Sequence, residues 1–119
     1  MTKRLRLVVF QDAPGRWHAR ALEHDLSAEG STIGQAVRSL ARTIQVHAEY
    51  DARHHHPPLV AFPASAQRFW NAFATGTTVA LGQLGVTAPD GWQFQAAFAT
   101  RLPGEPRPGF RPQYSEART

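Results

Sequence analysis

The sequence contains no cysteine, a single lysine and no long hydrophobic run. Without cysteine the chain has no disulfide, no thiolate nucleophile and no thiolate ligand for zinc. A membrane-spanning helix needs about 20 apolar residues, and no apolar run in this chain approaches that length. The apolar stretch at residues 7–10 is also too short for the core of a signal peptide. We therefore expect a cytoplasmic protein that needs no cofactor.

Hydrophobic residues make up 42% of the chain and aromatic residues 10%. A chain of 119 residues with this composition can bury a core without disulfides or metals. We expect one domain over residues 1–102. Residues 103–119 contain four prolines and no periodicity, which predicts a disordered or extended Pro/Arg-rich tail. Phe110 and Tyr114 make this tail either a short recognition segment or a passive end.

The first 30 residues have the pattern of a β-hairpin followed by a short strand. Residues 4–11 alternate, with Leu5, Leu7 and Val9 on one face. The turn sequence at 12–15 contains proline and glycine, and alternation resumes at 17–22, which predicts an antiparallel partner strand. Residues 26–29 are expected to form a third strand that glycine ends.

Two helices and a last strand follow. Thr32 is expected to cap a helix that runs to about residue 50, with an apolar face of Ile33, Ala36, Val37, Leu40, Ile44 and Ala48. A shorter helix is predicted over residues 65–74, with Ser65 as its N-cap and with Phe69, Trp70 and Phe73 in the core. Alternation predicts a strand over 92–101, whose Trp92 and Phe94 should pack on the same core. The fold class is α+β, a small antiparallel sheet in the order β-β-β-α-α-β.

Candidate catalytic and metal-binding residues are few, and we expect neither catalysis nor a metal. The acids nearest the predicted sheet do not form a converging set at their spacing: Asp12, Glu23, Asp25 and Glu29. Neighbouring His54, His55 and His56 cannot all face one ion and are expected to form a solvated loop. No nucleophile motif surrounds the serines near the two histidines of the hairpin region: Ser27, Ser31, His18 and His24.

The net charge of +4 comes from arginines that are interleaved with acids. A nucleic-acid-binding domain usually clusters its positive charge. Because these arginines are scattered, nucleic-acid binding is the alternative function and not the leading one. It would use Arg4, Arg6, Arg16, Arg20, Arg38 and Arg42.

The first half of the chain resembles the HicB-like antitoxin family. The resemblance lies in Gly15-Arg16-Trp17-His18-Ala19, in the loop and short strand at residues 22–30, and in the capped helix at 31–40. It implies a truncated RNase H-like sheet without nuclease activity, which dimerises and inhibits a small ribonuclease toxin. Residues 51–119 lack the helix pair of the DNA-binding domain that many members carry.

We accordingly predict a protein-binding module that forms a homodimer and binds a small basic toxin-like protein. The acidic loop after the second strand would complement a basic partner. The residues predicted to bind the partner lie on that strand and loop: Trp17, His18, Arg20, Glu23, His24 and Asp25.

Overall fold

The computed structural model of the chain describes residues 2–100. The elements follow the predicted order, with one further strand and one 3-10 turn between the second helix and the last strand. They are β1 (Lys3–Ala13), β2 (Arg16–Ala21), β3 (Ser27–Gly30), α1 (Ile33–Arg53), α2 (Gln67–Thr75), β4 (Thr77–Val79), η1 (Leu81–Leu84) and β5 (Trp92–Phe98). This confirms the α+β class. The tail predicted at 103–119, with Phe110 and Tyr114, lies outside the described residues.

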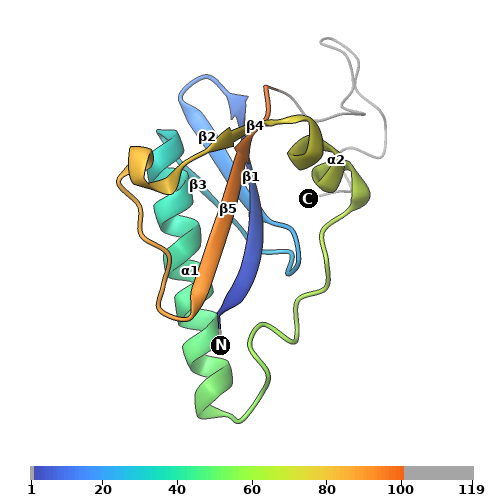
Figure 1. Cartoon of the computed structure of the whole chain (residues 1–119), viewed down its shortest axis with the longest axis vertical. Helices are drawn as coiled ribbons and strands as arrows, with labels where there is room; N and C mark the ends of the chain where they lie inside the picture. The colour runs from blue at the N-terminus through green and yellow to red at the C-terminus, as the bar shows by residue number, and fades with distance from the viewer. Residues whose placement is uncertain (1, 101–119) are drawn as a thin grey trace.

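The five strands form one mixed sheet in the order β3-β2-β1-β5-β4 (Figure 1). The hairpin is antiparallel as predicted, with Gly15 at a positive φ of 71° in its turn. The prediction of a wholly antiparallel sheet was wrong, because β5 runs parallel to β1. The chain reaches β5 through both helices, and such a crossover connection permits parallel pairing.

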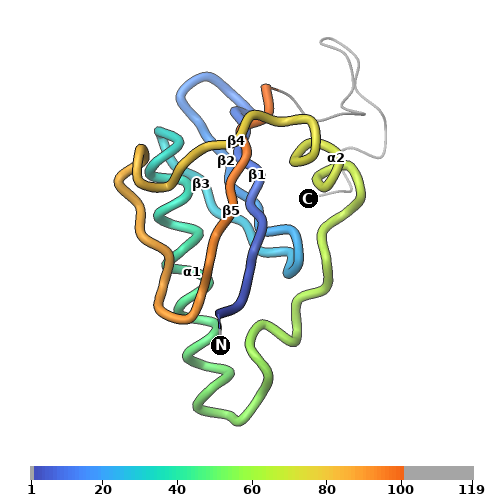
Figure 2. The backbone as a smooth tube through the Cα atoms, in the orientation of Figure 1, coloured from blue at the N-terminus to red at the C-terminus, as the bar shows by residue number. Residues whose placement is uncertain are grey.

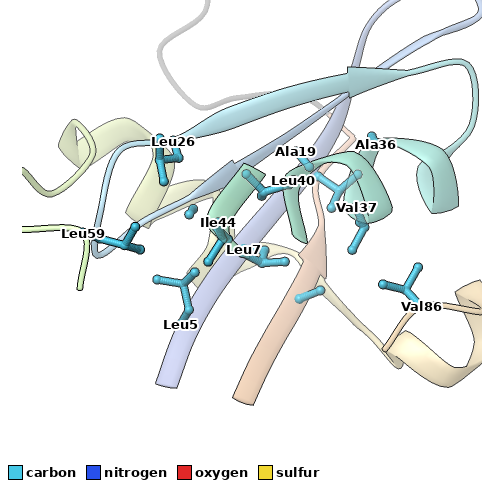
Figure 3. Packing of buried hydrophobic residues seen from close by; sticks show 13 residues of the cluster. Leu5, Leu7, Ala19, Leu26, Ala36, Val37, Leu40, Ile44, Leu59 and Val86 are labelled. Atoms are coloured by element: carbon cyan, nitrogen blue, oxygen red, sulfur yellow. The ribbon is translucent and has the colours of Figure 1, made fainter. Parts of the chain in front are cut away.

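The sheet carries a helix on each face, so the protein has two cores. The long helix α1 covers one face, where the residues drawn in Figure 3 pack together around Leu7, Leu40 and Ile44. The short helix α2 covers part of the other face, where Phe69 packs on Val8 and Phe10. The expectation that Trp92 and Phe94 share a core with Phe69 was wrong. Both belong to the α1 face, because alternate residues of a strand point to opposite faces.

The start of α1 is fixed by its cap and by a close contact with β3. The Gln35 backbone N–H donates to Thr32 Oγ1 at 3.1 Å, which confirms the predicted cap. Gly30 lies against the first turn, since a Cβ there would lie 2.6 Å from the Ala36 nitrogen. The helix ends at Arg53 rather than near residue 50, and His54 closes it through Tyr50.

The segment between the helices carries the chain from one face of the sheet to the other (Figure 2). Asp51 is buried near the end of α1, and its Oδ2 accepts from the Leu59 backbone N–H at 2.7 Å. Leu59 is itself fully buried, so the segment is anchored at its start. Within residues 2–100, no helix has the length and apolar character needed to cross a membrane.

The prediction that Ser65 caps α2 was wrong. The helix begins at Gln67 with Ala66 at the cap position and no side-chain cap. Ser65 is buried instead, and its hydroxyl lies 2.8 Å from the Ala21 carbonyl oxygen and 2.7 Å from Asp25 Oδ1. Serine therefore ties the segment before α2 to the end of β2, which no local sequence pattern encodes.

Candidate functional site

Of the six residues predicted to bind a partner, the three on β2 lie on two faces of the sheet, and the other three lie in the loop after β2. Trp17 points to the α1 face, where its ring lies 5.7 Å from that of Phe98. His18 and Arg20 point to the α2 face, beside Phe10 and Phe69. This separation follows from the alternation of β2, which places neighbouring residues on opposite faces.

Arg20 connects three parts of the structure. Its Nη1 lies 2.6 Å from Oδ1 of Asp25, and its guanidinium carbon lies 4.2 Å from the ring centre of Phe69. Its Nη2 lies 3.5 Å from His18 Nε2, so the imidazole nitrogen is the acceptor and the ring proton belongs on Nδ1. The Arg20 Nε is buried and has no acceptor within the described residues. Arg20 therefore holds β2, the following loop and α2 together.

Asp25 is a charged anchor inside this network. Burial acts to raise the pKa of Asp25, but hydrogen bonds from Ser65 and Arg20 outweigh it and lower the pKa below the usual value. The backbone N–H of Asp25 donates to the Pro63 carbonyl oxygen at 2.7 Å. The side chain is therefore ionised at neutral pH and engaged within the protein.

Glu23 and His24 are also used to hold the loop. Glu23 Oε1 accepts from the Arg6 backbone N–H at 2.8 Å, and its Oε2 lies 3.3 Å from Arg6 Nη1. His24 Nδ1 lies 3.1 Å from the Phe62 carbonyl oxygen and donates to it. The acidic loop is thus attached to β1 and to the segment before α2, and its carboxylates reach solvent only in part.

A second group of polar side chains lies at the turn end of the hairpin and was missed by sequence reasoning. Asp12, His18 and Glu29, which we call the strand-end cluster, come from three adjacent strands. His18 Nδ1 lies 4.0 Å from Asp12 Oδ2 and 3.7 Å from Glu29 Oε2. The hairpin register and a short third strand would have placed His18 directly opposite Glu29, whereas Asp12 lies at an irregularity in the pairing of β1 with β2.

The environment of His18 keeps its ring neutral and fixed. Burial and the neighbouring Arg20 charge lower the pKa of His18, and Asp12 and Glu29 oppose this without reversing it. The ring stacks on Phe10 with a centroid distance of 4.8 Å, and 14% of the side chain is exposed. Nδ1 therefore points between two carboxylates from a ring that has little freedom to turn.

The outer edge of β3 presents unpaired backbone groups. Ala21 N–H donates to the Leu26 carbonyl, so the β2–β3 ladder bonds continue through Ala28 and Gly30. The N–H and C=O groups of Ser27 and Glu29 consequently point outward. Both side chains are exposed. Within the described residues, these outward N–H and C=O groups make no hydrogen bond to another backbone group. This edge offers two donors and two acceptors to an added strand.

The six arginines of the alternative function do not form one surface. Three of them contact acids within the protein: Arg6 with Glu23, Arg16 with Asp12, and Arg20 with Asp25. Arg38 and Arg42 lie on α1, on the opposite face of the sheet from Arg20. Their positive charge is divided between faces and partly neutralised.

The histidine tract lies far along the chain from both groups. His54 stacks on Tyr50 at 4.1 Å and closes α1, while His56 Nδ1 lies 3.8 Å from Asp51 Oδ1. All three histidines are exposed, and His55 has a positive φ of 60°.

Comparison of the chain with family models, with curated proteins and with solved structures finds no match.

Proposed function

We propose that this chain is a non-catalytic protein-binding module, of the kind that the HicB-like resemblance implies, which binds a small basic protein at the β3 edge. The observation that carries the proposal is the outward direction of the Ser27 and Glu29 backbone groups on an exposed edge strand. Edge strands of this kind recruit an extended segment by main-chain hydrogen bonds, and neighbouring side chains select it.

The charge at this edge favours a basic partner. Within residues 2–100, the ion-pair contact of Glu29 is with His18, whose ring is neutral at pH 7 because its pKa is lowered. Glu29 is about half exposed and keeps its charge available to an incoming lysine or arginine. A cross-strand pair of opposite charge supports strand addition and directs its register.

The loop carboxylates have a supporting role in this proposal. Glu23 and Asp25 hold β2 and its loop in place, so the β3 edge is presented on a rigid support. The sheet has a second edge at β4, so a homodimer and a bound partner strand need not compete for the same backbone groups. A small ribonuclease toxin is the basic partner that the resemblance implies.

The test is purification of the tagged full chain from its native cell, with intact mass spectrometry of what co-purifies. Ser27→Pro is the informative variant, because it removes an outward N–H and leaves the β2–β3 ladder donors intact. We expect a stoichiometric small basic protein with the parent chain and its loss with Ser27→Pro. Glu29→Lys should also release it.

The matched control is Glu49→Lys, which makes the same charge reversal on the exposed surface of α1. This variant should retain the partner, and circular dichroism should show that all variants are folded. A partner that Ser27→Pro retains in full would contradict binding at β3. Co-purification of nucleic acid in place of a protein would favour the alternative function.

A further inference from the structure

The strand-end cluster has the composition of a metal site. Asp12, His18 and Glu29 each offer one ligand atom, and these three atoms all lie within 4.8 Å of one another. Asp12 lies near the end of β1, beside the hairpin turn, His18 lies within β2, and Glu29 lies on β3. We propose that this cluster binds a divalent first-row transition metal through one imidazole nitrogen and two carboxylate oxygens.

The geometry requires small side-chain movements. Metal bonds of about 2.0–2.2 Å place neighbouring ligand atoms roughly 3–3.5 Å apart. The present separations from His18 Nδ1 are 3.7 Å to Glu29 and 4.0 Å to Asp12. Asp12 and Glu29 lie at the surface and can rotate inward, while His18 stays in place against Phe10. Because the ligands approach from the protein side, further coordination positions face solvent.

The electrostatics also suit a cation. Asp12 and Glu29 bring two negative charges, and the exposed Arg16 offsets one of them by contact with Asp12 Oδ1 at 2.9 Å. This contact leaves Asp12 Oδ2 directed toward His18. A metal bound at Nδ1 takes the place of the proton there, and the neutral ring then carries its proton on Nε2.

The proton on Nε2 would face Arg20 Nη2, which lies 3.5 Å away. That distance is at the limit of a hydrogen bond, so little is lost when it breaks, but the neighbouring positive charge weakens the site. We therefore expect modest affinity. Imidazole with carboxylates selects Mn²⁺, Co²⁺ or Zn²⁺ over Mg²⁺ and Ca²⁺, and the absence of thiolate disfavours softer ions.

The test is an NMR titration of the untagged full chain with Mn²⁺ and, separately, with Zn²⁺. Paramagnetic broadening by Mn²⁺ should begin at Asp12, His18 and Glu29, and Zn²⁺ should shift the His18 ring nitrogens. Glu29→Gln removes one anionic ligand at an exposed position and should weaken binding by at least about tenfold. Asp12→Asn should act in the same direction.

His55→Gln is the matched control, because it alters the exposed tract and leaves the strand-end cluster intact. It should retain the response at His18. Broadening confined to residues 54–56, or binding that Glu29→Gln does not weaken, would overturn the proposal. The isolated chain is used throughout, so this result does not depend on whether a protein partner binds at β3.

Discussion

Arg20 and Asp25 form an ion pair, with 2.6 Å between Nη1 and Oδ1, that fastens the end of β2 to the loop after it. The same guanidinium lies over Phe69 of α2, and Ser65 reaches the same carboxylate oxygen. Two residues predicted as partner contacts therefore hold the sheet to its second helix. Replacing either residue would therefore change partner binding indirectly, through the position of β3.

The first prediction concerns this ion pair. Asp25→Asn keeps the size of the side chain but removes the charge that Arg20 contacts. Because the pair is partly exposed, we expect a loss of about 1–2 kcal/mol in the free energy of unfolding. Urea denaturation measures it, and Glu49→Gln on the surface of α1 serves as control. Equal stability of the two variants would show that the pair contributes nothing to folding.

The second prediction concerns the buried hydroxyl of Ser65. Ser65→Ala removes the donor to the Ala21 carbonyl and to Asp25, and leaves a buried acceptor unsatisfied. We expect a loss of about 1–3 kcal/mol in the free energy of unfolding. Ser27→Ala, at an exposed position on β3, should change stability little. If Ser65 were only a helix cap, its replacement would loosen α2 alone, and hydrogen exchange at β2 would be unchanged.

The third prediction is that acid destabilises the protein in two steps. The folded pKa of His18 is below its ordinary value of about 6.5, so folding holds the ring neutral. The contribution of the neutral ring to folding stability is therefore complete above the ordinary pKa of about 6.5, and it is lost as the pH falls through the lower folded pKa. The pKa of Asp25 is also lowered, so its contribution is present above about 3.8 and is lost at lower pH.

Urea denaturation at a series of pH values measures both steps. His18→Gln should remove the step that begins near neutral pH and leave the lower one in place. A variant that retained the full decline between pH 7 and 5 would show that another group is responsible.

Local patterns were enough to predict the elements but not their pairing. The alternation of Leu5, Leu7 and Val9 correctly indicated the α1 face, and Thr32 correctly indicated the start of α1. The three residues of β4 carry no detectable periodicity, so that strand was missed. The parallel pairing of β5 with β1 depends on where both helices pack, which short-range patterns do not encode.

The same limit applies to the candidate site. Strand parity and hairpin register predict that His18 lies beside Glu29 and Phe10, so part of the strand-end cluster was within reach of the sequence. The contacts of Asp25 with Ser65, and of His24 with Phe62, join segments about 40 residues apart. No spacing rule predicts such contacts, because they arise when the segment after α1 crosses to the second face.

The last prediction concerns Gly30, where β3 meets the start of α1. A Cβ at this position would lie 2.6 Å from the Ala36 nitrogen and 2.8 Å from the Gln35 carbonyl carbon, so Gly30→Ala forces the strand and the helix apart. Strain of this kind costs about 1–3 kcal/mol. Gly82→Ala is the control, since nothing lies within 4 Å of its Cβ position. Because β3 would move, Gly30→Ala should also weaken partner binding at the Ser27 and Glu29 edge, whereas Gly82→Ala should not. Urea denaturation and the pull-down described above measure the two effects, and equal behaviour of the two variants would contradict this close contact.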